Sequence, residues 1–333
     1  MSNRTGMRRV AAAACVAALA GLLAGCPEEP HAPTQRKRRV ALIMKSLANE
    51  FFKTMEEGAE AHQKKNAGHY ELIANGIKDE RDVAKQIGIV EQMIAQKVDA
   101  IVIAPADSAA LVPVCKRAID AGIVVVNIDN KFDEAALQER KVQIPFVGPD
   151  NRKGARMAGE HLGTRLKRGD KVAIVQGIPN AINGVMRRLG FEAAMDEAGA
   201  EVVTSQTAYW EMAKAEKVVS GMLTQHPDLK AILCANDSMA LGAVAALKAA
   251  GKLGEVHVVG FDNISAIQEY ILDGKVLCTV DQHADQIAVE GIRMALDVLA
   301  GETPPPQRDT RVDLITAEVL KQRKPKEPAE PQS

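Results

Sequence analysis

The segment DAIVIAPADSAALVPVCKRAIDAGIVVVNID, residues 99–129, decides the fold of this chain. Two short runs rich in Val and Ile open and close it, and the stretch 107–121 between them has the periodicity of a helix. Runs that are apolar at nearly every position are typical of strands buried on both faces of a parallel sheet. The segment therefore predicts a strand, a helix and a second, parallel strand.

The same alternation continues on both sides of this segment. The elements expected before it are the strands RVALIMK (39–45) and YELIANG (70–76) and helices at 51–66 and 80–96. After QIPFVGPDN (143–151) the pattern restarts with the apolar runs KVAIVQG, EVVTSQTA, AILCAN, VHVVGFD and VLCTVDQ. We therefore predict an α/β protein with two doubly wound parallel-sheet lobes. A further helix at 291–302 and a late strand at 311–319 suggest that the chain crosses back between the lobes.

The first 37 residues predict export and a lipid anchor. A basic start, an apolar run over 10–24 and the tetrapeptide LAGC at 23–26 are typical of a signal peptide that covers residues 1–25. LAGC resembles the lipobox of bacterial lipoproteins, in which the cysteine, here Cys26, carries the lipid and becomes the mature N-terminus. The alternative is an ordinary signal peptide with a chance cysteine. Residues 26–37 then form a flexible tether, and residues 323–333 a disordered tail.

Composition and absent motifs exclude several classes of protein. The 333 residues carry a net charge of −1, whereas a nucleic-acid binder normally has a basic face. The chain has no GxGxxG, P-loop or GxSxG motif, and its seven histidines lack metal-ligand spacing. We therefore expect no cofactor, no metal site and no enzyme activity. Cys115, Cys234 and Cys278 fit small buried apolar residues, with a Cys234–Cys278 disulfide as the alternative.

Aromatic, acidic and amide side chains follow the strands at the edge where parallel sheets bind ligands. These candidate residues are Lys45, Asn49, Phe51 and Phe52 after the first strand, and Asp129, Trp210, Asn236, Asp262 and Gln282 after later ones. Flat aromatic faces cover the apolar faces of a sugar ring, and charged or amide groups satisfy its hydroxyls. Arg187 joins them because it lies near a helix start, where the helix dipole disfavours a cation. The set predicts a site for a small polyhydroxylated molecule.

Several of these positions also have a purely structural interpretation. Asp237 and Asp79 have the position of helix N-caps, and Asp129 and Asp262 are placed to cap the helices that follow them. The aromatic pair can pack the lobe, and either Arg187 or its neighbour Arg188 can be a solvated charge. The prediction of a site therefore depends on the whole set of residues.

Seven segments carry a resemblance to a known family. They are KSLANEFF (45–52), IVIAPADS (101–108), VVVNIDN (124–130), NGVMRRLGFEAA (183–194), ILCANDSMALGAVAALKAAG (232–251), VVGFDN (258–263) and TVDQHADQIA (279–288). Over residues 38–322 the chain resembles the periplasmic substrate-binding proteins of ABC sugar importers, of the ribose, allose and galactose type. The resemblance implies the type I fold of that family, with three hinge crossings near 146–150, 281–284 and 309–312. The N-terminal lobe would comprise 38–147 with 284–309, and the C-terminal lobe 148–283 with 310–322.

The resemblance also implies a role for each candidate residue. Asn49 and Asp129 would hydrogen-bond a sugar from the N-terminal lobe, with Phe51 and Phe52 stacking on it. From the other lobe it implies Arg187, Asn236 and Asp262 as hydrogen-bonding residues, Trp210 as the opposing platform and Gln282 as a contact from the hinge. Lys45 matches a lysine of allose-type binders. Glu50, Asn130 and the bulk of Trp210 depart from the ribose-type pattern.

The implied function is that of a lipid-anchored, monomeric binding component of an ABC sugar importer, without enzyme activity. It would capture an allose-like or ribose-like monosaccharide between closing lobes and pass it to a transmembrane permease. The protein would be exported and held on a membrane by its N-terminal lipid. The alternatives are a binder of a polyol, inositol or signalling sugar that feeds a sensor, and a LacI-type regulator. The signal peptide argues against the regulator.

Overall fold

The computed structural model describes residues 36–323, and residues 37–323 belong to one compact unit. The predicted signal peptide, Cys26, the tether before residue 36 and the tail beyond residue 323 lie outside the described residues. Within 36–323, no helix combines the length and the apolar composition that a membrane span requires.

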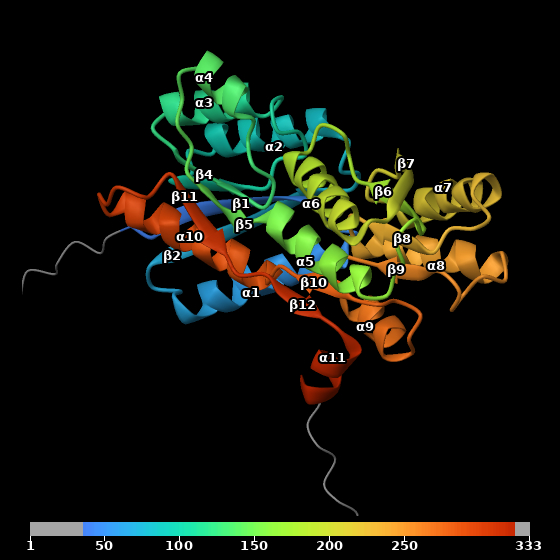
Figure 1. The fold of residues 1–333 in the computed structure, drawn as a ribbon. Coiled ribbons are helices and arrows are strands. Elements are labelled where there is room, and N and C mark those ends of the chain that lie inside the picture. Colours follow the sequence, from blue (N-terminus) through green and yellow to red (C-terminus); the bar gives the residue numbers. More distant parts are fainter. Residues whose placement is uncertain (1–35, 324–333) are drawn as a thin grey trace, which may run out of the picture. The chain divides into compact units, whose positions relative to one another are not determined.

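A six-stranded, entirely parallel sheet organises what we call the first lobe (Figure 1). In spatial order its strands are β11 (Gln307–Thr310), β5 (Phe146–Pro149), β4 (Val124–Ile128), β3 (Ala100–Ile103), β1 (Arg38–Ser46) and β2 (Tyr70–Ile77). The segment 99–129 supplies two neighbouring strands of this sheet, β3 and β4, as its pattern predicted.

A four-stranded parallel sheet organises the second lobe. Its order is β7 (Glu201–Thr207), β6 (Lys171–Gln176), β8 (Ala231–Cys234) and β9 (His257–Val259). Single bridges at Val259–Cys278 and Asp262–Asp281 extend this sheet towards β10 (Thr279–Asp281). β10 in turn pairs antiparallel with β12 (Asp313–Ile315).

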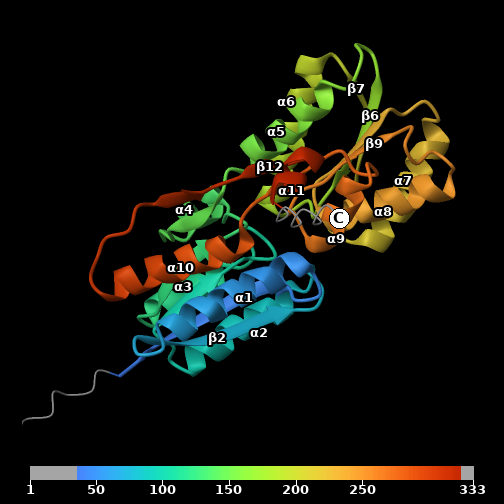
Figure 2. The same ribbon diagram turned by 90° about the horizontal axis from the view of Figure 1, so that it is seen from below.

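Helices cover the sheets of both lobes. Those of the first lobe are α1 (Glu50–Lys65), α2 (Val83–Ala95), α3 (Val112–Asp120), α4 (Glu134–Glu139) and α10 (Ala284–Leu299). Those of the second lobe are α5 (Asn151–Gly163), α6 (Ile182–Ala198), α7 (Met212–Gln225), α8 (Asp237–Ala249), α9 (Ser265–Leu272) and α11 (Ala317–Arg323). Figure 2 shows α10 beside α1, although more than 200 residues separate them in the chain.

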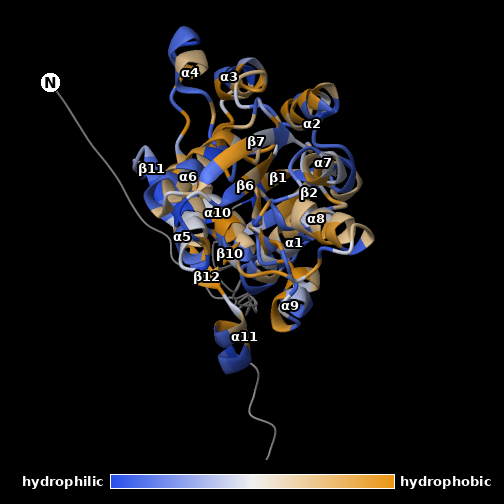
Figure 3. Ribbon diagram, turned by 45° about the vertical axis from the view of Figure 1, so that its right-hand side comes forward, coloured by the Kyte–Doolittle hydropathy of each residue, from blue (hydrophilic) through white to orange (hydrophobic). Residues whose placement is uncertain are grey.

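The core of the first lobe follows from the alternation of side chains along β1. Val40, Leu42 and Met44 belong to the apolar cluster that includes α1, whereas Ala41 and Ile43 belong to the cluster on the opposite face, with α2 and α3. Both faces of the strand are buried, which explains why its sequence is a continuous apolar run. The helices need only one apolar side, and Figure 3 shows both hydrophilic and hydrophobic residues along α2 and α8.

The predicted α/β fold with two parallel-sheet lobes is confirmed, but the late elements differ from the expectation. The predicted helix at 291–302 begins already at Ala284. The predicted late strand at 311–319 is present but shorter, as β12, because α11 begins at Ala317. A second strand, β11, precedes it and was not predicted; β11 pairs with β5 of the first sheet, whereas β12 pairs with β10. The lobe boundaries 38–147 with 284–309, and 148–283 with 310–322, stay a prediction.

Candidate functional site

A pocket of about 230 Å³, part of it open to solvent, lies between the carboxyl ends of the two sheets. Its first-lobe half is lined by Lys45, Asn49, Phe51, Phe52, Glu80 and Asp129. Its second-lobe half is lined by Asn183, Arg187, Trp210, Asn236 and Asp262. Nine of the ten residues predicted as ligand-binding therefore come together here, from segments that are far apart in the sequence.

Asn49 and the two phenylalanines are placed by the start of α1. The Asn49 side chain caps the helix by accepting a hydrogen bond from the Phe51 N–H at 3.1 Å. The two rings meet edge to face, with centroids 5.1 Å apart and planes at 84°. Both side chains are buried and both line the pocket, so the aromatic pair contributes to the core and to the site at once.

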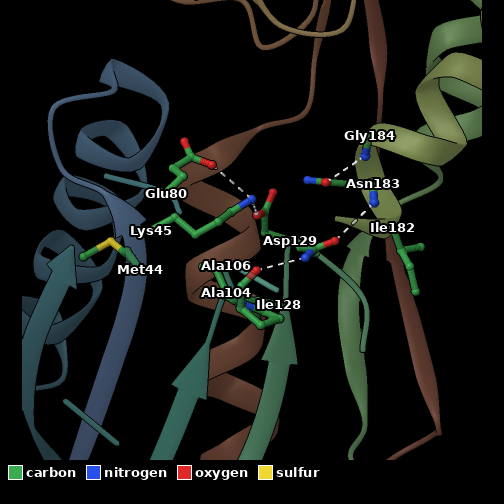
Figure 4. Close-up of polar contacts among 12 residues, drawn as sticks. Met44, Lys45, Glu80, Ala104, Ala106, Ile128, Asp129, Ile182, Asn183 and Gly184 are labelled. Carbon is green, nitrogen blue, oxygen red and sulfur yellow. Dashed lines mark hydrogen bonds and ion pairs between the residues drawn. The ribbon is translucent and has the colours of Figure 1, made fainter. Parts of the chain in front are cut away.

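Lys45 provides a buried cation in the first-lobe half (Figure 4). Its Nζ lies 3.1 Å from Asp129 Oδ2 and 3.6 Å from a carboxylate oxygen of Glu80. Burial alone would lower the pKa of Lys45, but the carboxylates of Asp129 and Glu80 raise it above its usual value. Burial raises the pKa of Glu80, which Lys45 opposes. Lys45 is therefore a charged donor that two acidic neighbours hold in place.

Asp129 follows β4 in a strained conformation. Its φ of +61° lies in the left-handed region, which costs free energy for a residue other than glycine. The side chain is 2% exposed. Oδ2 has the Lys45 ammonium as its neighbour, but it accepts no well-directed hydrogen bond from a residue within 36–323. The strained backbone thus places in the pocket a carboxylate oxygen, Asp129 Oδ2, that can still accept a hydrogen bond.

Arg187 is the corresponding buried cation of the second-lobe half. Its hydrogen bonds run from Nε to Asn151 Oδ1 at 2.8 Å, from Nη1 to Ala235 O at 2.8 Å and Asp262 Oδ1 at 3.4 Å, and from Nη2 to Gln282 Oε1 at 3.0 Å. The guanidinium carbon lies 3.9 Å from the centroid of the Phe261 ring. Burial lowers the pKa of Arg187, and nearby carboxylates, led by Asp262, oppose the shift. A guanidinium has five N–H groups, so these four bonds leave one donor for the pocket.

Trp210 forms the aromatic wall opposite the phenylalanines. It follows β7 with a φ of +68°, next to Tyr209 with a φ of +57°. Its six-membered ring lies against the backbone of Gly177, where a Cβ would clash with the ring carbons. Its Nε1 is buried and has no hydrogen-bond partner among residues 36–323. Trp210 is thus held by its benzene ring while its N–H donor stays unused.

One carboxyl group behind the second-lobe half, that of Asp237, has a different role from the one predicted. The N-cap of α8 is Asn236, whose Oδ1 accepts from the Met239 N–H at 2.9 Å, so the assignment of this cap to Asp237 is wrong. Asp237 is buried inside the helix start, where it accepts from Thr279 Oγ1 at 2.7 Å and from the Ile264 N–H at 3.1 Å. Burial raises its pKa to about 7, which these hydrogen bonds oppose. It is a structural carboxyl group next to the pocket.

The other structural interpretations have mixed outcomes. Asp79 does not cap α2, because Asp82 accepts the hydrogen bond from the Lys85 N–H at 2.9 Å. Neither Asp129 nor Asp262 is the N-cap of a helix. Arg188 pairs with Glu192 on the same helix at 2.6 Å and takes no part in the pocket, so one of the two arginines is indeed a surface charge.

Gln282 lies behind the pocket and is fully buried. Its amide accepts from Arg187 and donates to Asp262 Oδ1 at 2.6 Å, so it joins the two charged groups. Burial raises the pKa of Asp262 well above its usual value, while Arg187 opposes the shift. The structure therefore gives Gln282 a positioning role within this network.

Sequence reasoning missed Glu80 and Asn183. Glu80 comes just after the end of β2, at the same sheet edge as Lys45, and the strand-end rule applied to that strand would have found it. Asn183 lies four residues before Arg187 on α6, and helical spacing places both on one face. Glu80 could therefore have been predicted from the end of β2, and Asn183 from its helical spacing to Arg187.

The cysteines of the described chain agree with the expectation from sequence. Cys115, Cys234 and Cys278 are free and buried, so no disulfide joins the last two. Burial raises the pKa of all three thiols, to about 12 for Cys115. Within residues 36–323 no three His, Cys, Asp or Glu side chains are grouped closely enough to hold a metal ion.

The chain belongs to the periplasmic binding protein domain family, whose family model matches residues 40–303. A relative from Pseudomonas aeruginosa, named D-ribose/D-allose-binding protein, is 56% identical over 319 residues, which cover 95% of this chain and 99% of the relative. The resemblance drawn from the sequence segments is therefore confirmed. Because the family and this relative are binding proteins, the expectation that the chain is not an enzyme is also confirmed.

Two solved structures share the fold over nearly all of their length. A solute-binding protein of an ABC transporter from Burkholderia multivorans, with an unknown ligand, has a TM-score of 0.82 at 56% identity and covers 84% of this chain and 99% of its own. The corresponding protein from Actinobacillus succinogenes, with bound D-allose, has a TM-score of 0.82 at 35% identity and covers 86% of this chain and 100% of its own.

Proposed function

We propose that this protein captures a monosaccharide between its two lobes and delivers it to the permease of an ABC importer. Allose-like and ribose-like sugars are the first candidates, because the Pseudomonas relative is named for both and the Actinobacillus structure holds D-allose. An inositol or an acyclic polyol is the alternative ligand of the same site.

The observation that carries this proposal is a pair of buried polar atoms without hydrogen-bond partners. Within residues 36–323 three buried side-chain atoms have none, and two of them, Asp129 Oδ2 and Trp210 Nε1, belong to residues that line this pocket. Nearly all buried polar groups in proteins are hydrogen-bonded. A hydroxyl both donates and accepts, so a polyhydroxylated ligand can satisfy the acceptor on one lobe and the donor on the other.

The surrounding residues complete a site that suits a sugar ring. Phe52 and Trp210 provide flat apolar surfaces for its C–H faces, while Lys45 and the free N–H of Arg187 donate to its hydroxyls. Because these groups belong to two lobes, the ligand binds the closed form more tightly than the open form. We assign the direct contacts to Lys45, Asn49, Phe51, Phe52, Asp129, Arg187, Trp210, Asn236 and Asp262, and a supporting role to Gln282.

A thermal-shift screen of the purified full chain tests the proposal. The panel comprises D-allose, D-ribose, D-galactose, myo-inositol and D-arabitol. A ligand at 100 times its Kd adds about 2.7 kcal/mol to the free energy of unfolding, which is a shift of several degrees. We expect at least one pentose or hexose to give it. The proposal fails if every member leaves the melting temperature unchanged.

We also propose that Cys26 carries a lipid after removal of residues 1–25, and that a monomer is thereby held on a membrane. Two or more acyl chains suffice for stable anchoring, and the LAGC sequence supports this modification. Replacing Cys26 with Ser should move the protein from the membrane fraction to the soluble fraction of an expressing bacterium. Cys15→Ser is the matched control and should stay with the membrane. An unchanged distribution of Cys26→Ser refutes the anchor.

A further inference from the structure

The N-terminus of α6 has no cap of its own, although this helix carries Asn183 and Arg187 into the pocket. The first four N–H groups of a helix lack partners within it, and a side chain at the N-cap usually accepts from one of them. The N-cap residue here is Ala181, which has no side chain that can do so. The Gly184 N–H donates to the Asn183 side chain at 2.8 Å, but the N–H groups of Ile182 and Asn183 must find acceptors outside the helix.

The acceptors come from the other lobe. Ser108 Oγ accepts from the Ile182 N–H at 3.1 Å, and Asn130 Oδ1 accepts from the Asn183 N–H at 3.1 Å. In addition, the Ser108 N–H donates to the Asn180 carbonyl at 3.1 Å. Ser108 and Asn130, which we call the cross-lobe cap, thus replace the missing N-cap through contacts that exist only while the lobes touch.

The first lobe holds both residues of the cross-lobe cap in position. The Asn130 amide group donates to the Pro105 carbonyl at 2.9 Å, which fixes its oxygen towards α6. The Ser108 hydroxyl donates to that same oxygen at 3.3 Å. Asn130 is fully buried and Ser108 is 3% exposed, and neither lines the pocket. Their polar atoms are therefore committed to α6 and are not available to a ligand.

The cross-lobe cap is close in the chain to residues of the pocket on both sides. Asn130 directly follows Asp129, and Ile182 and Asn183 begin the helix that carries Arg187 one turn later. Closure therefore forms the cap and joins the two halves of the pocket in a single movement. We propose that Ser108 and Asn130 are positioning residues that stabilise the closed form, and so set the affinity for the ligand and its rate of release without touching it. This inference rests on the proposed function.

The expected effect follows from the cost of removing a helix cap. Loss of an N-cap side chain typically weakens a helix by an amount equivalent to about a fivefold change in an equilibrium constant. Only contacts that differ between the open and closed forms contribute to closure, and these contacts belong to the closed form alone. Asn130→Ala and Ser108→Ala should each raise Kd about fivefold to tenfold. Most of the change should appear in the dissociation rate, because the encounter with the open form is unaltered.

Stopped-flow fluorescence of the full chain, with D-allose and D-ribose as probes, measures both rates. Trp210 is the only tryptophan of the chain and lines the pocket, so it reports binding directly. Asp133→Ala is the matched control, since the Asp133 side chain caps α4 at 2.8 Å within the first lobe, and the substitution keeps the backbone hydrogen bond from the Asp133 N–H to the Ser108 carbonyl. The control should lose stability without a change in the dissociation rate. Ser108→Ala removes a single hydroxyl and keeps the test valid if Asn130→Ala folds poorly.

Hydrogen–deuterium exchange of the Ile182 and Asn183 amides tests the cross-lobe cap without relying on a sugar. These amides should exchange about tenfold faster in Asn130→Ala than in the wild type, while amides in the middle of α6 keep their rates. Equal exchange in both proteins, with and without sugar, overturns the inference. So does wild-type dissociation in both alanine variants. If the wild type binds neither sugar but the exchange difference is present, the cap stands and the proposed ligand class is wrong.

Discussion

The two halves of the pocket are built from the same kinds of residue but use them differently. Each half has one buried cation, acidic partners and an aromatic wall. In the first-lobe half, carboxylate oxygens of Asp129 and Glu80 lie 3.1 and 3.6 Å from the Lys45 Nζ. Asp129 Oδ2 can still accept a hydrogen bond from a ligand. In the second-lobe half, Arg187 uses four of its five N–H groups within the protein.

The difference indicates a division of labour between the lobes. The Arg187 network joins Asn151 of α5, Ala235 after β8, and Gln282 after β10, so it also holds the second lobe together. The first-lobe half contributes less to the stability of its own lobe and leaves more hydrogen-bonding groups available to a ligand. Substitutions in the two halves should therefore separate binding from stability.

The largest effect is expected for Arg187→Ala. It removes four hydrogen bonds and leaves the buried Asp262 without its cation, which typically costs roughly 3–5 kcal/mol of unfolding free energy. Sugar binding should be abolished and the melting temperature lowered by about 10 °C. Differential scanning calorimetry with and without sugar measures both. Arg188→Ala, on the same helix, is the matched control and should resemble the wild type, whereas an unchanged stability of Arg187→Ala would contradict the division of labour.

Asp129→Asn should act on binding far more than on stability. The amide keeps an oxygen acceptor but loses the charge, and a hydrogen bond to a charged group contributes about 1.5–3 kcal/mol. The affinity for the sugar should fall roughly 10-fold to 100-fold in a calorimetric titration. The melting temperature of the free protein should change by only a few degrees, since Glu80 still neutralises Lys45. Asp133→Asn should leave both quantities unaltered. A loss of stability as large as that of Arg187→Ala would show that the halves do not differ.

Gly177→Ala tests whether the position of Trp210 matters on its own. The new methyl group would meet the ring carbons of Trp210, so the indole must move away from its place in the pocket. The affinity should fall about tenfold through lost contact with the ring, without removal of any charged group. Gly88→Ala is the control, because a Cβ there meets nothing within 4 Å. Trp210 emission should shift in the first variant and stay constant in the second, and an unshifted emission in Gly177→Ala would remove the assigned role of this contact.

The smallest effect concerns pH and the second lobe. The folded pKa of Asp237, about 7, lies above its ordinary value of 3.8, so between these values the folded protein holds a proton that the unfolded chain has released. Stability from this group is present at low pH and is lost as the pH rises through 7, at no more than about 1.4 kcal/mol per pH unit. Urea unfolding from pH 5 to pH 8 should show the decline. Asp237→Asn should make the decline shallower without abolishing it, because the raised pKa values of Asp262 and Glu80 act with the same sign. An unchanged slope in the variant would assign the decline to those groups.

Much of the fold and of the site was readable from the sequence. Buried parallel strands need apolar residues at nearly every position, so the pattern at 99–129 specified β3, α3 and β4. The strand-end rule then gave eight of the predicted ligand-binding residues that surround one pocket, and the helix-start argument added Arg187.

The parts that could not be predicted depend on partners far away in the chain. Asp237 looks like an N-cap, but Asn236 one residue earlier takes that role, while the Asp237 carboxylate finds partners in Ile264 at the start of α9 and in Thr279 of β10. The separate strand β11 at Gln307–Thr310 was not predicted, because it is defined by its pairing with β5, which lies far away in the chain. The acceptors for the start of α6 belong to the other lobe, and no local pattern reveals them.

A crystal structure of the full chain grown with D-allose tests most directly whether one ligand joins the two halves of the pocket. We expect the sugar ring between Phe52 and Trp210, with one hydroxyl donating to Asp129 Oδ2 and others accepting from Trp210 Nε1 and Arg187. A sugar bound anywhere else, or bound by residues of a single lobe, would contradict the proposed role of this pocket.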